Sequence, residues 1–596
     1  RTTNRVIATV TEFAGASLRI DQILLGWMEL DWWRRLSLSG QHLAFRGTSA
    51  APGPVTFEVA GSEGGARVLD VTSPWAPAFV PAGRLVISGV ATLAFNVDDP
   101  TGRRYALANP AGIQTPISIQ RDTLPQRWLR DVDMSADYIV ITADEFEGSA
   151  GDLATWRRTH LRGIASDMPV GQTPRDARTA VVRVSDIYDE FSGGRPDVAA
   201  IRNFLKYAWL NWGSSLPEDR LRYVCLLGDA NRDTRDREGT GVRNLVPTWE
   251  GGYDTATILD SNPAYASDDF FGRFDGPADR ITDLAIGRIP VVDPEIAEDL
   301  IRRKIVGVES FDGFNPKRNR AILVADDVCQ AGRSDPLGVT HILQTETIDR
   351  YIPKQFDRLK IYLYDYGQND CSLLSRPGAK RDLIQAMNEG AWLVNYIGHG
   401  GDQVLADEKV LETTDVPSLT NLEDLSVLVA ASCSVGKFNR AGSDGLAEAL
   451  VKWPNGGCLG AIAATHLSFS GENEDLNRRI LQFLFPGGDN RSVTLGTALL
   501  KAKIAQTMTT NFCSPTGDLE PCDRPKKYLL FGDPAAVIVG PNGQIRITEA
   551  PDTLDRGTLV TVRGEVMRPD STRDESYQGM IDLLVEDQPD LSLIHI

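Results

Sequence analysis

The 596-residue sequence lacks the short motifs that mark several common enzyme classes. It contains no Gly-x-Ser-x-Gly nucleophile elbow, no His-Glu-x-x-His helix, no Gly-x-x-x-x-Gly-Lys-Ser/Thr phosphate loop and no Gly-x-Gly-x-x-Gly fingerprint. Nucleotide-dependent and metalloprotease chemistry therefore have no support in the sequence.

Positive charge and long apolar runs are also scarce. Lys and Arg number 62 against 81 Asp and Glu, which gives a formal net charge of −19. This balance argues against nucleic acid or an anionic membrane as a partner. No apolar run reaches the length of about 20 residues that a membrane-spanning helix needs, so we expect a soluble chain without a transmembrane segment. The sequence begins with Arg rather than Met, so we expect a processed or partial chain, which says nothing against export.

Cysteine is limited to seven residues, none of them in a Cys-x-x-Cys pair, so a structural zinc site is not expected. Cys225 and Cys458 lie in apolar strand-like runs and are expected to be inert core residues. Cys513 and Cys522 bracket a polar loop and are predicted to close a small disulfide, which would favour an oxidising compartment. The odd total leaves at least one free thiol, and we expect it to be Cys433.

The hydrophobic pattern divides the chain into segments. Residues 1–130 show short alternating strands and predict an all-β module. Strands then alternate with amphipathic helices, which predicts an α/β fold of two tandem parallel-sheet subdomains over 131–315 and 316–542. Residues 543–590 look like the start of a truncated Ig-like β-sandwich. The final hexamer, 591–596, resembles a sequencing artefact, so His595 carries no functional weight.

Two segments carry the chemistry. Leu393-Val-Asn-Tyr-Ile-Gly-His399 and Leu428-Val-Ala-Ala-Ser-Cys433 are apolar strands that each end in a reactive side chain among small residues. In an open parallel sheet such ends meet at one edge, where His399 would act as the base for a Cys433 nucleophile. The backbone amides of Gly400 and Cys433 would form an oxyanion hole. The alternative is that His399 is a packing residue and Cys433 a buried thiol.

The same segments resemble the catalytic His and Cys regions of the gingipain family of cysteine peptidases. The resemblance extends in order through Asp137-Tyr-Ile-Val-Ile-Thr, Leu226-Leu-Gly-Asp229, Ser267-Asp-Asp, Ile286-Gly-Arg-Ile289 and Phe531-Gly-Asp-Pro534, and it covers roughly residues 135–540. It implies a caspase-like fold in which His399 is the base and Cys433 the nucleophile.

The resemblance also implies an acidic residue that orients the histidine. An ungapped match places it at Asp327, where a strand-end turn with a helix cap is the alternative. Trypsin-like members of the family bind a basic side chain through a further acid, but that position falls near Gly338, with Asp335 the nearest acid. Specificity for Arg or Lys is therefore not carried over from the family. Thr465 and Phe469 are predicted to border the specificity pocket.

No cofactor is predicted to be required. Gingipains bind calcium in the region that corresponds to Ser267-Asp268-Asp269, so the resemblance makes Asp268 and Asp269 candidate ligands of a structural Ca²⁺. Solvated acidic loops are the alternative.

We therefore predict a cysteine endopeptidase, secreted or on a bacterial cell surface, that cleaves protein or peptide substrates. The N-terminal module contains the segments Asp31-Trp-Trp-Arg-Arg and Val71-Thr-Ser-Pro-Trp75. With them it also resembles the sortase of the type IX secretion system, which would transfer the acyl group to an amine and would have outer-membrane secretion machinery as its partner. An inactive peptide-binding scaffold is the alternative from another class. The natural substrate, activation by cleavage and oligomeric state cannot be predicted from the sequence.

Overall fold

The computed structural model describes residues 35–576, apart from 39, 48–52, 74–75, 89–90, 116–127, 132, 162–174, 214–218, 252–263, 277–278, 312–315, 331–332, 336–337, 355, 368–370, 373–374, 487–492, 510–524, 538–543, 552–558 and 569–571. The chain divides into two compact units, Arg1–Pro125 and Gln126–Ile596. Each unit is described below by itself.

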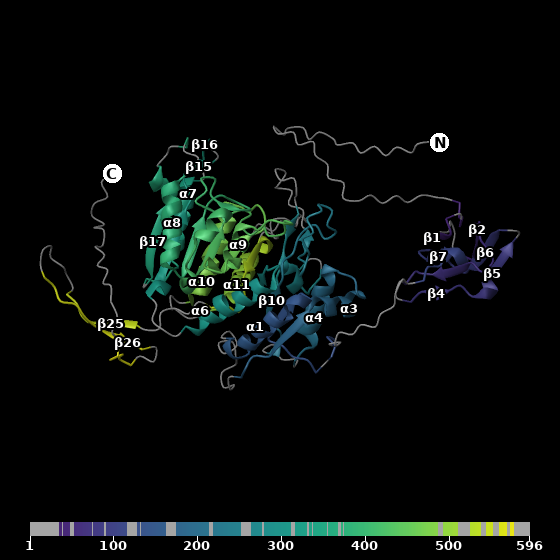
Figure 1. Ribbon diagram of the computed structural model, residues 1–596, viewed down its shortest axis with the longest axis horizontal. Coiled ribbons are helices and arrows are strands. Elements are labelled where there is room, and N and C mark those ends of the chain that lie inside the picture. Colours follow the sequence, from purple (N-terminus) through teal and green to yellow (C-terminus); the bar gives the residue numbers. More distant parts are fainter. Residues whose placement is uncertain are drawn as a thin grey trace. The chain divides into compact units, whose positions relative to one another are not determined.

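The first unit is built from antiparallel β-sheets around a small aromatic core (purple in Figure 1). Phe45, Phe57, Phe95 and Tyr105 pack with ring centroids 5.1–6.5 Å apart, and Leu38, Val59 and Leu107 are fully buried around them. The strands of its two sheets are β1 (His42–Arg46), β7 (Arg104–Ala108), β3 (Arg67–Asp70) and β4 (Ala78–Phe79), and β2 (Val55–Ala60), β6 (Thr92–Val97) and β5 (Leu85–Ser88).

The second unit contains a sheet of ten strands with helices, so the predicted α/β class is confirmed (Figure 1). From one edge to the other the strands are β17 (Asp357–Tyr362), β14 (Arg320–Ala325), β18 (Leu393–Ile397), β22 (Ser426–Ala431), β23 (Cys458–Ala464), β24 (Tyr528–Phe531), β13 (Ala285–Ile289), β10 (Tyr223–Leu227), β8 (Tyr138–Thr142) and β9 (Thr179–Arg183).

The two predicted subdomain sheets are joined into this one sheet by β24. The first five strands in that order are mutually parallel, and so are the last five. β24 pairs antiparallel with β23 and parallel with β13, so strand direction reverses between the halves. The carboxyl ends of the strands in one half therefore point in the opposite direction to those in the other half.

Both faces of the sheet are covered, as the uninterrupted apolar strands require. In β8, Tyr138 and Val140 belong to one buried cluster with Leu153 of α1, whereas Ile139 and Ile141 belong to a second cluster with Phe204 of α4. The helices are α1 (Glu147–His160), α3 (Val184–Ser192), α4 (Val198–Asn211), α5 (Pro294–Asp299), the π-helix η7 (Leu300–Val306), α6 (Gly307–Ser310), α7 (Gly338–Asp349), α8 (Pro377–Glu389), α9 (Leu446–Lys452), α10 (Ser470–Leu484) and α11 (Leu495–Thr509).

A buried ion cluster ties the segment after β24 to the first half of the sheet. The guanidinium of Arg157 in α1 lies 2.6 Å from Asp533 and 2.6 Å from Glu309, and the hydroxyl of Tyr138 donates to Asp533 over 3.0 Å. All four side chains are nearly inaccessible to solvent. Burial of a charged pair is tolerated when its partners satisfy it in this way, so the cluster fixes how the two halves meet.

Toward the carboxyl end, β25 (Gln544–Glu549) and β26 (Arg563–Met567) form an antiparallel hairpin. This hairpin falls in the segment predicted as a truncated sandwich, and residues 591–596 lie outside the described residues. None of the helices in the described part of the chain combines the length and apolar character needed to span a bilayer.

Candidate active site

His399 and Cys433 follow neighbouring parallel strands at the same level. β18 pairs with β22 in a register that sets Ile397 opposite Ala431, and each reactive residue comes two positions later. The glycine after the histidine shows how near the two segments lie, since a Cβ on Gly400 would be 2.4 Å from Ser432 Oγ and 3.1 Å from the Cys433 carbonyl oxygen. The structure therefore brings the two predicted residues together at the carboxyl ends of two adjacent strands.

Cys433 is partly exposed and is held by the segment that follows β23. Its Sγ donates to the carbonyl of Ser468 over 3.3 Å, and the Ser468 amide donates to the sulfur over 3.4 Å. The next residue, Ser434, has a φ of 57°, which only glycine adopts readily. This left-handed residue turns the chain sharply after the thiol, and its amide donates to the carbonyl of His466 over 3.1 Å. Sequence analysis did not identify Ser468 as part of the site.

The carboxylate beside the His399 ring belongs to Asp335. Oδ2 of Asp335 lies 3.1 Å from Nε2 of His399. The aspartate side chain is only 5% exposed, whereas the histidine side chain is 24% exposed. A buried carboxylate at this distance fixes the orientation of the ring.

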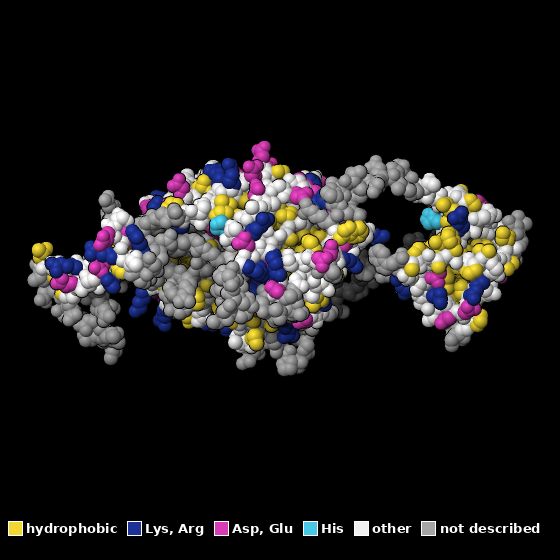
Figure 2. All heavy atoms as spheres, turned by 90° about the horizontal axis from the view of Figure 1, so that it is seen from below, with side chains coloured by type: hydrophobic (Ala, Val, Ile, Leu, Met, Phe, Trp, Pro, Cys, Tyr) yellow, Lys and Arg dark blue, Asp and Glu magenta, His cyan; other side chains and the backbone are white. Residues whose placement is uncertain are grey.

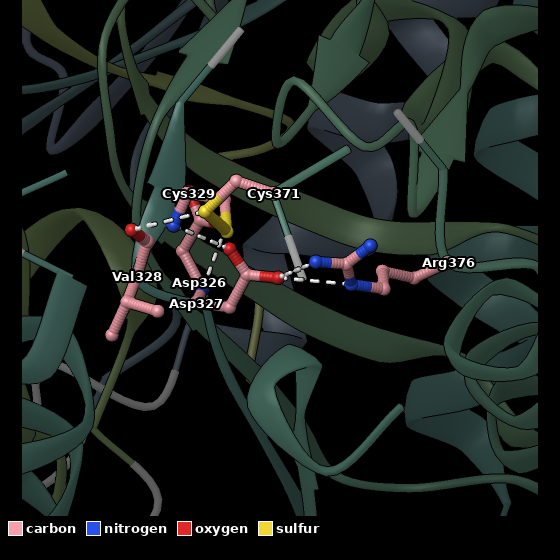
Figure 3. The surroundings of a disulfide bond; sticks show 6 residues. All are labelled: Asp326, Asp327, Val328, Cys329, Cys371 and Arg376. Atoms are coloured by element: carbon pink, nitrogen blue, oxygen red, sulfur yellow. Dashed lines mark hydrogen bonds and ion pairs between the residues drawn. A yellow bond between two sulfur atoms is a disulfide. The ribbon is translucent and has the colours of Figure 1, made fainter. Parts of the chain in front are cut away.

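The prediction that Asp327 orients His399 is wrong in this structure. The Asp327 carboxylate is instead bound by Arg376, whose Nε lies 2.9 Å and whose second terminal nitrogen lies 2.8 Å from Oδ2; both side chains are fully buried (Figure 3). The other oxygen, Oδ1, accepts the Cys329 amide over 2.8 Å. Asp327 therefore closes the turn after β14 and neutralises a buried cation.

Asp326, the residue before it, holds the backbone of the histidine rather than its ring. Oδ2 of Asp326 accepts the His399 amide over 2.8 Å. The Tyr396 hydroxyl donates to the His399 carbonyl over 2.5 Å. Burial raises the pKa of Asp326 well above its ordinary value, and nearby Glu408 and Asp327 act in the same direction. Of the two strand-end acids, Asp326 therefore binds the main chain of the histidine, whereas Asp327 is paired with Arg376.

Asp335 directly follows a short hairpin, and a disulfide anchors that hairpin. Strands β15 (Cys329–Gln330) and β16 (Arg333–Ser334) form the hairpin, and the Asp335 amide donates to the Val328 carbonyl over 2.6 Å. Cys329 is bonded to Cys371, with Cα atoms 5.2 Å apart (Figure 3). The predicted Cys513–Cys522 pair lies outside the described residues. Cys225, Cys433 and Cys458 are free, and Cys225 and Cys458 are buried as expected.

A second histidine, His341 in the first turn of α7, faces the same carboxylate. Its Nε2 lies 3.9 Å from Oδ2 of Asp335, and its ring is perpendicular to that of His399 with centroids 5.4 Å apart. The residue is 4% exposed. Burial lowers the pKa of His341, and the neighbouring His399 lowers it further. The sequence contained no signal for this placement, because it depends on how α7 packs.

The residues expected around the specificity pocket differ in how far they are exposed to solvent. A Cβ on Gly338 would lie 2.2 Å from the Asp327 carbonyl oxygen, so the start of α7 is packed against the chain and no side chain fits there. Thr465 is 2% exposed and its hydroxyl donates to the Ala266 carbonyl over 2.7 Å. Phe469 is 38% exposed and directly follows Ser468. Of the two predicted pocket residues, only Phe469 is at the surface.

Asp268 and Asp269, the candidate calcium ligands, are each engaged by a cationic side chain. Asp268 accepts Nε of Arg288 over 2.8 Å and the Thr248 hydroxyl over 2.8 Å. Asp269 accepts Nζ of Lys503 over 2.7 and 2.8 Å. A cation already neutralises each carboxylate, so this pair does not fit a calcium site.

The described surface carries both signs of charge. Figure 2 shows Lys and Arg side chains interspersed with Asp and Glu over the face it displays.

Comparison with known proteins gives a match to the family model described as Peptidase family C25 over residues 131–539. Gingipain R2 of Porphyromonas gingivalis is 24% identical over 301 residues, which is 50% of this chain and 32% of that relative. Gingipain R1 of the same organism is 24% identical over the same length, 24% of that relative. The match covers less than a third of the length of these curated relatives.

Two solved structures are also similar. The Arg specific cysteine proteinase gingipain R has 21% identity and a TM-score of 0.48, with 70% of this chain and 82% of that chain covered. Dimeric latent PorU from Porphyromonas gingivalis has 17% identity and a TM-score of 0.46, with 91% of this chain and 44% of that chain covered.

Proposed function

Because this chain belongs to peptidase family C25, we propose that it is a cysteine endopeptidase with Cys433 as nucleophile, His399 as base and Asp335 as the residue that orients the base. The observation that carries the proposal is the register of β18 and β22, which sets His399 and Cys433 at the same level on adjacent strands. A thiol beside an imidazole that is itself held by a buried carboxylate is the arrangement that cysteine peptidases use.

In the proposed reaction His399 takes the proton of Cys433, and the sulfur attacks the carbonyl carbon of the substrate peptide bond. The tetrahedral intermediate collapses, the C–N bond breaks, and His399 gives the proton to the departing amine. Water then attacks the thioester, loses its proton to His399 and releases a carboxylic acid with the regenerated thiol. Asp335 keeps the ring aligned through both steps and stabilises the imidazolium.

Negative charge develops on the carbonyl oxygen in each step, and we assign its stabilisation to the backbone amides of Gly400 and Cys433. The close approach of the two segments supports this assignment, since only glycine at position 400 leaves room for Ser432. The donors are main-chain groups that the parallel strands fix in place, so they need no rearrangement during the reaction.

We propose that the substrate side chain next to the cut is not basic. Asp335 already interacts with His399, and Gly338 leaves no space for an acidic side chain at the start of α7. Phe469 is exposed one residue after Ser468, which contacts the nucleophile, so we assign it to the border of the pocket. An apolar or uncharged substrate residue suits such a border.

We propose that the protein works outside the cytoplasm, as a secreted or cell-surface enzyme. The support is the Cys329–Cys371 disulfide, since such bonds persist in oxidising compartments. The acceptor of the acyl group is proposed to be water, because Cys433 is partly exposed. A sortase would share every step up to the thioester and would then use an amine.

The test is cleavage of a mixed peptide library by the wild-type chain and by Cys433→Ala, with Cys458→Ala as the control for a free but buried thiol. We expect cleavage to disappear only in Cys433→Ala. Mass spectrometry of the products, with and without an added primary amine, identifies the acceptor: free carboxylates in both samples support a hydrolase, and amide products would replace it with a transferase. Equal cleavage by wild type and Cys433→Ala would reject the mechanism, and no cleavage by either would favour a peptide-binding scaffold.

A further inference from the structure

The proposed reaction leaves the buried imidazole of His341, beside the active site, without a role. Neither ring nitrogen of His341 makes a well-formed hydrogen bond among the described residues, although the residue is only 4% exposed; the amide of the neighbouring Gln344 donates to Ser470. A buried imidazole in this state is poorly compensated for the hydration that it loses. Such a buried imidazole is suited to bind a ligand that comes from outside the protein chain.

The surroundings of His341 indicate the chemistry of that ligand. Oδ2 of Asp335 lies 3.9 Å from His341 Nε2 and 3.1 Å from His399 Nε2. One ligand atom from each of the three residues lies within 4.8 Å of the other two. Donor atoms around a tetrahedral zinc ion are about 3.3 Å apart, given bond lengths of about 2.0–2.1 Å. Small side-chain rotations would therefore bring all three atoms to one ion.

The three donors also come from separate, well-fixed elements. Asp335 follows the hairpin that the Cys329–Cys371 disulfide fastens, His341 lies in the first turn of α7, and His399 follows the central strand β18. Convergence of three such elements on one point gives a preorganised site rather than a chance cluster on a loop.

We propose that Asp335, His341 and His399 bind Zn²⁺, with water at the fourth position, and that this ion reversibly blocks the active site. Two imidazoles and one carboxylate are a donor set that suits zinc and neighbouring transition metals, whereas Ca²⁺ and Mg²⁺ prefer oxygen ligands only. The binding itself does not depend on the proposed peptidase activity, while the inhibition rests on it.

The inhibition follows from the proton on His399. When zinc occupies Nε2, the remaining ring proton resides on Nδ1, so the neutral ring has no lone pair with which to accept the thiol proton. Because Asp335 also binds the ion, its carboxylate no longer contacts the His399 ring and no longer orients it. Removing the metal restores both functions, so zinc should act as a reversible inhibitor rather than a cofactor.

Zinc binding is tested first in Cys433→Ala, in which the thiol cannot supply a ligand. Competition with a chromophoric chelator should give one Zn²⁺ per chain, and adding His341→Gln should weaken the affinity at least tenfold. His42→Gln is the matched control, since His42 is an exposed residue of β1 in the other compact unit, and it should leave the affinity unchanged. Absence of zinc binding by Cys433→Ala, or equal binding with His341→Gln, would overturn the proposal.

Cobalt substitution in the wild-type chain gives a second measurement that does not rely on a variant. We expect visible absorption bands of a four-coordinate site with nitrogen and oxygen ligands, and no near-ultraviolet thiolate charge-transfer band. A strong thiolate band would place the ion on Cys433 and would overturn the assignment. For an active chain, zinc inhibition is measured relative to each variant's own rate without metal, and His341→Gln should require at least tenfold more zinc for half-inhibition. Loss of peptidase activity alone would leave the binding result standing, so the two proposals fail separately.

Discussion

Nε2 of His399 lies 3.1 Å from Oδ2 of Asp335, 64 residues away in the chain, so the carboxylate that contacts the proposed base is that of Asp335 and not that of Asp327 at the end of β14. The neighbouring carboxylate of Asp327 is taken by Arg376. Asp327 and Asp335, eight positions apart, therefore have different roles. Substituting Asp335 should affect catalysis, and substituting Asp327 should affect stability.

Asp335→Asn is expected to reduce kcat by about 10²- to 10⁴-fold while the protein remains folded, because an amide neither stabilises the imidazolium nor fixes the neutral ring in the required tautomer. Steady-state kinetics combined with circular dichroism measures both effects. Unchanged kcat would show that the His399–Asp335 contact is not used in the reaction.

Asp327→Asn should instead lower the free energy of unfolding, by about 3–5 kcal/mol, because it removes the carboxylate that is paired with the fully buried Arg376. Thermal or denaturant unfolding measures the loss, and the Asp335→Asn protein is the matched comparison. A variant as stable as wild type but with a large drop in kcat would restore Asp327 as the orienting acid.

Replacing both members of the disulfide, Cys329→Ser with Cys371→Ser, should lower both stability and kcat. The bond closes a separation of 42 residues, for which chain entropy gives an upper value of about 4 kcal/mol. It also fastens the hairpin that presents Asp335. The assay is run with a reductant that keeps Cys433 reduced, and Cys225→Ser serves as the control for a buried thiol. A double variant with unchanged kcat would show that the hairpin holds its position without the bond.

Ser434 should accept glycine but not a β-branched residue. Its φ of 57° costs a non-glycine residue roughly 1–2 kcal/mol, and a branched Cβ adds to that cost. Ser434→Gly is therefore expected to retain wild-type unfolding temperature and kcat, while Ser434→Val loses both. Equal behaviour of the two variants would mean that the turn after Cys433 is not constrained by its backbone.

A separate prediction concerns pH and Asp283, which lies just before β13. Burial, together with the nearby carboxylates of Asp279 and Asp275, raises its pKa to about 6. The folded state then binds more protons than the unfolded state, so Asp283 reduces stability progressively as the pH rises from about 4 to about 6. Asp283→Asn should be more stable than wild type at pH 8, by about 1 kcal/mol after allowance for partial exposure, and equal to it near pH 4. Unfolding temperatures of the two proteins at the two pH values test this. A higher unfolding temperature of Asp283→Asn at pH 4 would contradict the predicted direction of the pH dependence.

The sequence was informative where local pattern determines position. Apolar strands that end in His399 and Cys433 predicted their place in a parallel sheet, because strand order and direction follow from the α/β alternation. The structure agrees with that placement in the register of β18 and β22. The sequence also pointed to the acids after β14, one of which, Asp326, does bind the His399 amide.

Sequence pattern could not identify Asp335, since its position depends on a disulfide between residues 42 apart and on the packing of Gly338 against the turn. His341 was missed for the same reason. The continuous sheet was also not predicted, because β24 crosses from the second half to pair with β13 after a long intervening segment. Such long-range pairings leave no periodic signal in the sequence.

The central claim is that Cys433 is a nucleophile activated by His399. The most direct measurement is covalent labelling with a peptide-based acyloxymethyl ketone, followed by mass-spectrometric mapping of the modified residue in wild type and in His399→Gln. The account predicts a single modification on Cys433 in the wild-type chain and a rate at least 100-fold lower in His399→Gln, by analogy with the loss of a catalytic base. Modification of another cysteine in the folded protein, or an equal rate without His399, would contradict it.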